Sequence, residues 1–325
     1  MQERRYPKLY IKSKNELAKH ISHENFSKED ALILINDVLK NFNKYWKDSN
    51  HSEPEKQKYI RNAKFTKLGL FLQKINTLVI APHDKMLPKF IFGGIKKMNH
   101  AKAAQHLLGL KRKRTLLKID LRRFFEQISN KRVFDFFKYK CNCDIRASKI
   151  LAQLCCVPLG EKNSNAEEKS IARGFATSQR LAVWCNLDIF IKLDRLVQKK
   201  LKGHDPRISI YVDDIGITAS RVTEEKMTIL KTEIKKLLLS TDTNQKLEIN
   251  EKKTKITPHK DGMEYVGISL FRNKLGIGKK AKSKRDRIKK ELTKELSQKE
   301  KLPLKKKQKS MNIYKNYIEN ISKAN

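Results

Sequence analysis

The segment ISIYVDDIGIT, residues 208–218, constrains the fold more than any other part of the chain. Apolar residues occupy alternate positions on both sides of an Asp-Asp pair. Such alternation is typical of half-buried β-strands, and aspartate favours turns. The segment therefore predicts a β-hairpin with Asp213 and Asp214 at its tip.

A second apolar strand, TLLKID, ends on Asp120. If the two strands are neighbours in one sheet, the three carboxylates meet at one edge. An Asp-Asp pair in a turn is common by itself, but apolar residues flank this one, and like charges on a buried hairpin need a cation. Hard oxygen ligands suit Mg²⁺, and two such ions can serve one site.

Before, between and after these strands, apolar residues recur at helical spacing. Asn25 or Ser27 is expected to cap one helix, with Asp30 three residues after Ser27. The polar stretch 47–58 is expected to be a loop, and 59–80 to be mostly helical. Helical segments are predicted at 14–48, 59–80, 131–156, 179–200 and 222–239. The order of strands and helices indicates an α+β fold with a sheet packed on helices.

The charge balance is strongly basic. Lys and Arg number 73 against 35 Asp and Glu, giving a net charge of +38. Nucleic acid is the favoured polyanionic partner, an acidic membrane surface is a weaker one, and high solubility alone is the plain alternative.

The chain carries no apolar run of the roughly 18 residues that span a bilayer, and its first ten residues are too polar for a signal peptide. The five cysteines lack the spacing of a zinc site. We therefore expect reduced thiols, no membrane partner and a cytoplasmic location.

The last 55 residues predict two amphipathic helices separated by Pro303. Between Lys279 and Lys309 there are fifteen Lys or Arg and four acids. The apolar stripes Ile288/Leu292/Leu296 and Met311/Tyr314/Ile318/Ile321 are expected to pack together, leaving a basic face outside.

Six blocks in order resemble those of bacterial reverse transcriptases. YVDD resembles the signature box, and LLKIDLRRFFEQIS resembles the first acidic motif. The block at 172–190 resembles the template-gripping loop, and the block at 247–257 resembles the family motif that follows YVDD. The block at 263–278 resembles the primer-grip hairpin, and 90–107 looks like the fingers of retron-type and defence-associated enzymes.

Two features bear on the lineage. Arg173 replaces the usual Gln before Gly174, and Ser178-Gln179 resembles the loop of diversity-generating retroelements. The fingers block is closer to retron and defence enzymes. The chain is therefore similar to the retron and group II intron-like superfamily, with a defence-associated enzyme outside the retrons preferred.

The resemblance implies a right-hand polymerase fold, with a palm of antiparallel sheet and helices, fingers, and a C-terminal helical thumb. The expected divisions are an N-terminal helical extension (1–58), fingers (59–115), palm (116–262, with a fingers portion around 131–178), and a primer-grip hairpin with a basic helical thumb (263–325).

The resemblance also assigns residues. Asp120, Asp213 and Asp214 would be catalytic and hold two Mg²⁺ ions, with Mn²⁺ as a substitute. Phe125 would exclude a 2′-hydroxyl, and the alternative is that it is a core aromatic. The remaining nucleotide contacts would be Leu121, Arg61, Gly174, Arg173 and Lys253, and the nucleic-acid contacts would be Gly267, Lys284, Arg285, Lys289 and Lys290.

The implied activity is RNA-templated DNA synthesis from dNTPs in anti-phage defence, with an RNA template, a DNA product, an associated noncoding RNA and an accessory effector protein. The alternatives are a retron or diversity-generating-retroelement enzyme, an untemplated or protein-primed DNA polymerase, and a non-enzymatic RNA-binding scaffold. A scaffold predicts loss of the metal-binding acids, and all three are present.

Overall fold

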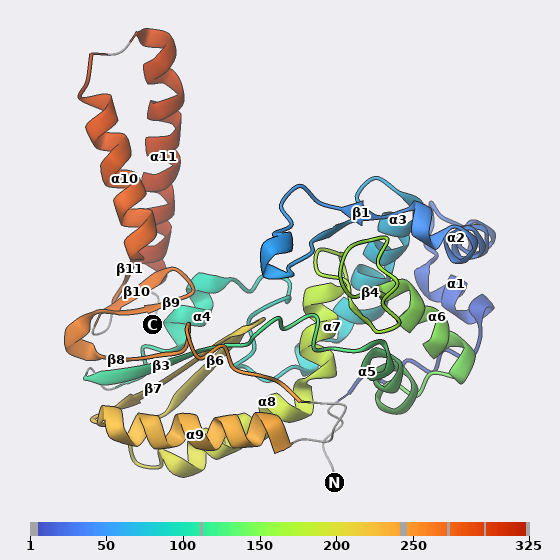
Figure 1. Cartoon of the computed structure of the whole chain (residues 1–325), viewed down its shortest axis with the longest axis horizontal. Coiled ribbons are helices and arrows are strands. Elements are labelled where there is room, and N and C mark those ends of the chain that lie inside the picture. Colours follow the sequence, from blue (N-terminus) through green and yellow to red (C-terminus); the bar gives the residue numbers. More distant parts are fainter. Residues whose placement is uncertain (1–5, 111–112, 241–245, 272–273, 296, 323–325) are drawn as a thin grey trace.

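The structure is a computed structural model that describes residues 6–110, 113–240, 246–271, 274–295 and 297–322. A lobe of sheet and helices carries a second, mostly helical lobe on one side and a long pair of helices on the other (Figure 1). Mixed helices and strands confirm the predicted α+β class.

The central sheet has four antiparallel strands in the order β6-β7-β3-β8. The predicted hairpin is present as β6 and β7, and the strand ending on Asp120 is β3, the direct neighbour of β7. The bounds are β3 Arg114–Asp120, β6 Arg207–Tyr211, β7 Asp214–Ser220 and β8 Lys255–Pro258.

Helices cover the sheet. Helices α8 (Leu187–Lys200) and α9 (Glu224–Ser240) lie along one face, and α4 (His100–His106) packs near β6 (Figure 1). The predicted helical stretch 131–156 contains α5 (Asn130–Asp135) and α6 (Ile145–Cys155), with a π-helical turn between them, and α7 (Ser178–Cys185) precedes α8.

The N-terminal helices α1 (Lys14–Ile21) and α2 (Lys28–Lys40) form as predicted. Ser27 caps α2, and its side chain and that of Asp30 form a reciprocal capping box. Their apolar faces join the same large core as the sheet strands, so the described part of the expected N-terminal extension, residues 6–58, shares that core with the rest of the protein.

The expectation of a mostly helical segment at 59–80 was only partly right. Strand β2 (Arg61–Asn62) pairs with β1 (Lys47–Asp48), so the two strands form a hairpin whose connection includes most of the expected loop. The pairing also crosses the domain boundary that was expected after residue 58. Helix α3 (Lys67–Lys74) begins after its N-cap residue Thr66, whose side chain accepts a hydrogen bond from the Gly69 N–H. A π-helical and a 3₁₀ segment continue α3 to residue 86.

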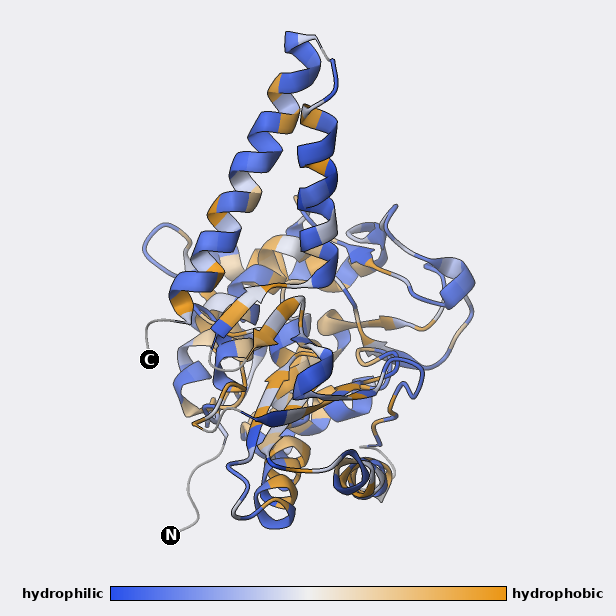
Figure 2. Ribbon diagram, turned by 90° about the vertical axis from the view of Figure 1, so that its left-hand side faces the viewer, coloured by the Kyte–Doolittle hydropathy of each residue, from blue (hydrophilic) through white to orange (hydrophobic). Residues whose placement is uncertain are grey.

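The C-terminal part has a three-stranded sheet followed by two antiparallel helices. The bounds are β9 Met263–Tyr265, β10 Ile268–Phe271, β11 Lys274–Ile277, α10 Lys279–Leu292 and α11 Gln298–Ile321. The short strands β4 (Cys156–Pro158) and β5 (Lys169–Ile171) form a separate pair. Helices α10 and α11 pack against each other and project from the sheet, with hydrophilic residues over most of their surface (Figure 2).

Pro303 does not separate the two helices, which corrects that prediction. It lies inside α11, and α10 ends at Leu292 before α11 begins at Gln298. Ser297 and Glu300 form a capping box that starts α11, whereas Pro303 removes only one N–H early in the helix. Ile288 and Ile318 of the predicted stripes are buried, and Leu296 lies outside the described residues.

Within the described ranges, no helix combines the length and apolar character needed to cross a membrane. All five cysteines belong to the described part of the chain and are free thiols, and burial raises the pKa of each.

Candidate active site

The carboxylates of the two predicted strands meet because of strand register. Asp120, at the end of β3, stands directly opposite Asp214, the first residue of β7. The turn between β6 and β7 is tight, with Val212 in the left-handed region at φ +58°. The backbone N–H of Leu121 donates to the Asp213 carbonyl at 3.0 Å, which ties the end of β3 to this turn. The structure therefore places all three aspartates together where β3 ends and β7 begins. We call this end of the sheet, with Asp120, Asp213 and Asp214, the acidic edge.

Burial dominates the electrostatics of the edge. It raises the pKa of the Asp213 carboxyl, and the charges of Asp214 and Asp120 raise it further. Burial likewise raises the pKa of Asp214, although Lys118 opposes the shift. The negative charge at this edge is therefore only partly balanced by the protein.

Lys118 is a residue that the motif reading missed. Its Nζ lies 3.0 Å from Asp214 Oδ1, whereas the predicted Lys253 Nζ lies 3.7 Å from Asp120 Oδ2 and its side chain is mostly exposed. Lys118 precedes Asp120 by two positions on β3, so strand alternation places both on one face. That spacing was the available signal for Lys118.

The donor set suits a hard divalent cation, because carboxylate oxygens with unbalanced charge are what such ions bind. Among the residues that the structure describes, no three carboxylate, imidazole or thiolate groups form a ready-made ligand cluster. The fit to a metal therefore rests on the chemistry and charge of the aspartates.

Stability without metal should depend on pH through these carboxyls. A folded-state pKa raised above the ordinary value of 3.8 means that the folded protein binds the proton more tightly than the unfolded chain. Stability is then lost as the pH rises from about that ordinary value through the raised pKa. In a chelator, Asp213→Asn should be more stable than wild type at neutral pH, and the difference should shrink as the pH falls. Thermal unfolding of both proteins over a pH series measures it, and a difference that does not change with pH would contradict it.

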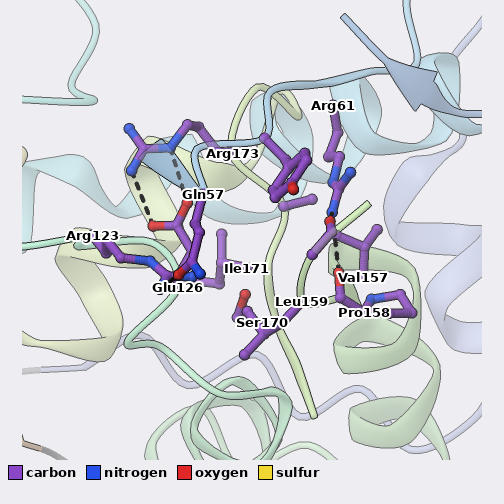
Figure 3. Close-up of a pocket in the computed structure, with 13 residues that line it drawn as sticks. Gln57, Arg61, Arg123, Glu126, Val157, Pro158, Leu159, Ser170, Ile171 and Arg173 are labelled. Carbon is purple, nitrogen blue, oxygen red and sulfur yellow. Dashed lines mark hydrogen bonds and ion pairs between the residues drawn. The ribbon is translucent and has the colours of Figure 1, made fainter. Parts of the chain in front are cut away.

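Phe125 and Arg173 form one stacked unit. Phe124 is fully buried and Phe125 is 7% exposed, and the Arg173 guanidinium lies 5.0 Å from the centre of the Phe125 ring. Arg173 also pairs with Glu126 at 3.0 Å (Figure 3). The charge of Arg173 lowers the pKa of Asp213, so the stacked unit lies close enough to the acidic edge to act on it electrostatically.

Arg61 is packed inside the protein, and its assignment as a triphosphate-gripping cation stays a prediction. Its side chain is 3% exposed and pairs with Asp48. Its guanidinium donates to the carbonyls of Pro158, at 3.1 Å, and Gly160 (Figure 3). The guanidinium also lies over the Trp46 ring. These contacts bind the β1–β2 hairpin to the loop after β4.

Arg123 is a second missed residue. It lines a small pocket together with Gln57, Glu126 and Arg173, and its Nη1 donates to Gln57 Oε1 at 2.9 Å (Figure 3). Its backbone lies in the left-handed region at φ +44°. Such strain in a non-glycine residue persists where surrounding contacts impose it, often at functional sites.

The presence of glycine at position 174 has a local structural cause. Gly174 has φ +102°, and an added Cβ would stand 2.5 Å from the Arg61 carbonyl oxygen. The Arg61 N–H donates to the Arg173 carbonyl at 2.7 Å, so β2 runs close to this loop. Glycine is needed here for backbone packing within the protein.

The remaining predicted residues are spread out. The Leu121 side chain is buried in the core, so only its backbone faces the acidic turn. Gly267 follows Val266 in the turn between β9 and β10, and both have positive φ. Lys284, Lys289 and Lys290 are exposed on α10, which projects away from the acidic edge, while Arg285 is only 17% exposed beside Asp286 (Figure 1).

Tyr265 joins the C-terminal part to the acidic hairpin. Its buried hydroxyl lies 2.9 Å from the carbonyl oxygens of both Ser209 and Asp214. An added Cβ on Gly216 would stand within 2.9 Å of the Tyr265 ring, so this glycine makes room for the tyrosine. The β9 strand therefore supports the backbone that carries Asp214.

Comparison with known proteins identifies the family. Residues 66–270 match the reverse transcriptase (RNA-dependent DNA polymerase) family, and the chain belongs to it. The Retron Se72 reverse transcriptase of Salmonella heidelberg (strain 579083-10) is 27% identical over 214 residues. The matched stretch is 66% of this chain and 50% of the relative, so the chain spans about half the length of the curated relative that it matches.

This relative confirms the resemblance to bacterial retron-like reverse transcriptases; a lineage outside the retrons stays a prediction. A solved structure of telomerase from Candida albicans, in complex with a fragment of telomeric RNA, aligns with a TM-score of 0.37 and 11% identity, over 51% of this chain and 31% of that chain. Reverse transcriptase domains generally use divalent metal ions, in agreement with the acidic edge.

Proposed function

We propose that this chain is an RNA-templated DNA polymerase that adds a deoxynucleotide to a 3′-hydroxyl. The observation that carries the proposal is the register of Asp120 opposite Asp214, with Asp213 beside it in a buried turn, in a chain of the reverse transcriptase family. In the reaction, the 3′-oxygen forms a bond to the α-phosphorus, the bond to pyrophosphate breaks, and the hydroxyl proton is released.

Asp120 and Asp213 would hold both of two Mg²⁺ ions, and Asp214 would be an auxiliary ligand, with Mn²⁺ as a substitute. When bound, the ions would activate the attacking hydroxyl and stabilise the leaving oxygen. Lys118 holds Asp214 through its ion pair, and the Leu121 N–H holds the Asp213 backbone. These contacts orient the carboxylates before substrate arrives.

The right-hand layout is part of the proposal. The sheet β6-β7-β3-β8 with α8 and α9 would be the palm, and the β1–β2 hairpin with α3 would belong to the fingers. The strands β9–β11 would be the primer grip, with Gly267 in its turn, and α10 and α11 would be the thumb. The 263–325 division is supported by its own sheet and its projecting helical pair.

The contacts to the triphosphate of the substrate are assigned to basic residues that lie near the acidic edge. Arg123 donates only to a neutral glutamine among the contacts described, and it lies three residues after Asp120. Arg173 and Lys253 are the other proposed contacts, because Arg173 acts on Asp213 and Lys253 lies near Asp120. A guanidinium fork suits the oxygens of a triphosphate, and Arg61 is already bound within the protein.

Phe125 is proposed to select the sugar. Replacing it with alanine should increase incorporation of ribonucleotides relative to deoxynucleotides by roughly tenfold or more, because removing the ring relieves a steric clash that excludes the 2′-hydroxyl. Competing dNTP and rNTP extension by wild type and Phe125→Ala measures the ratio. Phe124→Leu, which changes the fully buried neighbour, is the control. A ratio that stays constant while activity survives would make Phe125 a core aromatic only.

Template dependence separates this function from its alternatives. Purified protein with Mg²⁺, a primed RNA and dNTPs should copy the RNA sequence. Product without template would favour untemplated synthesis, product attached to the protein would favour protein priming, and tight RNA binding without any product would favour a scaffold.

The associated noncoding RNA, the accessory effector and the anti-phage role are proposed from the resemblance alone. Sequencing the nucleic acid that co-purifies with the protein addresses the RNA. Phage challenge of cells carrying wild type or Asp120→Ala in the native locus addresses the defence role. Equal protection by the two would favour a scaffold, and no protection by the intact locus would favour a retroelement.

A further inference from the structure

Glu126 holds the guanidinium of Arg173 in a fixed plane. Glu126 lies in the turn after β3, directly after Phe125, and Arg173 lies two residues after the end of β5. The Arg173 Nε lies 3.2 Å from Glu126 Oε1, and its Nη2 lies 3.0 Å from Glu126 Oε2 (Figure 3). A carboxylate that engages two guanidinium nitrogens sets the orientation of the guanidinium as well as its position.

The ion pair is largely shielded from water. The side chains of Arg173 and Glu126 are only 18% and 13% exposed, and a partly buried pair is screened less by salt than a surface pair. The backbone of Arg173 is anchored as well, because its carbonyl accepts from the Arg61 N–H at 2.7 Å. Arg173 is therefore held at both its backbone and its guanidinium.

The guanidinium in turn packs on the Phe125 ring. Its central carbon lies 5.0 Å from the centre of that ring, within the range of about 6 Å in which a cation and an aromatic ring attract each other. The Phe124 ring also contacts Phe125, with their centres 5.7 Å apart. Between these neighbours Phe125 is almost fully buried, so its ring has little room to change rotamer.

A ring excludes a 2′-hydroxyl only if it does not move aside when the hydroxyl arrives. Side chains keep a precise geometry at a site when packing and hydrogen bonds from their neighbours lock their rotamers. Arginine has a long side chain with many rotamers, so without the Glu126 carboxylate its guanidinium would no longer stay on the ring. The ring of Phe125 would then lose one of the two neighbours that enclose it.

We propose that Glu126 is a positioning residue for sugar selection, because it holds the Arg173 guanidinium against Phe125 and so keeps the ring fixed beside the sugar of the incoming nucleotide. This inference rests on the proposed function, in which Phe125 excludes the 2′-hydroxyl. Glu126 engages the Nε and Nη2 of Arg173, so the Nη1 of the same guanidinium stays available for a phosphate of the substrate.

The test measures kcat/KM for an rNTP relative to the matching dNTP in single-nucleotide extension of a primed RNA. Loss of active protein cancels from this ratio, because the same enzyme uses both nucleotides. Glu126→Gln should raise the ratio about fivefold, the order of one cation–π contact. Arg173→Lys should act similarly, because an ammonium cannot form the planar fork. The control Glu233→Gln removes a carboxylate from an ion pair with Lys200 between α8 and α9, and should leave the ratio within about twofold of wild type.

A double-mutant cycle connects the effect to the ring. In a Phe125→Ala background, Glu126→Gln should change the ratio by less than about twofold, because no ring is left to position. Glu126→Asp, which keeps the charge on a shorter side chain, should raise the ratio less than Glu126→Gln does. If Glu126→Gln does not fold, Arg173→Lys alone and with Phe125→Ala carries the same test. An equal increase with and without the ring would overturn the proposal.

Nucleotide binding without chemistry separates this proposal from the proposed function. A primer that ends in a dideoxynucleotide cannot be extended, so the affinities of its complex for dNTP and rNTP are measured directly. If wild type neither extends a primer nor prefers dNTP in binding, the polymerase function itself falls. If wild type extends and discriminates but Glu126→Gln leaves the discrimination unchanged, only the role of Glu126 is overturned. Extension by wild type without discrimination would also overturn that role, because Phe125 would then select nothing.

Discussion

Asp213→Asn is expected to lower the rate of RNA-templated primer extension by about 10³-fold or more. The substitution removes a charged oxygen ligand where metal ions stabilise the transition state by several kcal/mol, and each 1.36 kcal/mol corresponds to tenfold in rate. Single-turnover extension with saturating dNTP and Mg²⁺ measures the loss. The same variant should be folded, because relief of crowding among buried carboxylates does not destabilise the protein.

The matched control is Asp261→Asn, which makes the same charge change at an exposed position before β9. It should leave extension within about twofold of wild type, as expected for a surface substitution. Mg²⁺ should raise the thermal midpoint of wild type and Asp261→Asn more than that of Asp213→Asn. Rapid synthesis by Asp213→Asn would remove Asp213 from the metal assignment.

Neutralising the basic face of α10 is expected to weaken RNA binding for all sequences. The variant converts Lys284, Arg285, Lys289 and Lys290 to glutamine. Each lost phosphate contact should reduce the slope of log affinity against log salt by about 0.7–0.9, which at about 0.1 M salt corresponds to on the order of 10²-fold for three contacts. Because Arg285 is only 17% exposed, the three lysines alone should give most of the effect.

A charge-matched control separates local contacts from net charge. Lys192, Lys199 and Lys202 are exposed on or just after α8, against the opposite face of the sheet (Figure 1). Changing these three to glutamine should leave the salt slope close to that of wild type. Extension of a saturating, pre-bound primer should change little in either variant, because α10 projects away from the acidic edge (Figure 1). Equal slopes for the α10 variant and wild type would mean that the α10 face is only solvated.

Local chemistry determined the parts of the fold that a short segment can specify. Alternating apolar residues around YVDD specified a hairpin, and the fold contains it with Asp213 and Asp214 at the turn. Ser27 and Asp30 marked a helix start that the structure confirms through their capping box. These features depend on neighbours within a few residues, which is why the sequence alone indicates them.

Long-range contacts decided the rest. Whether Asp120 faced Asp214 depended on β3 choosing β7 as its neighbour, since strand pairing is set by the whole sheet. Arg61 occurs in a motif-like setting, yet Asp48 and two distant carbonyls bind its guanidinium. Pro303 was read as a break, but the capping box at Ser297 sets where α11 begins. The sequence by itself thus determined which residues form the hairpin, cap a helix and supply the acidic side chains. Only the tertiary structure decided which basic side chains lie near those acids and which are bound inside the protein, because a guanidinium binds whichever oxygens the fold brings to it.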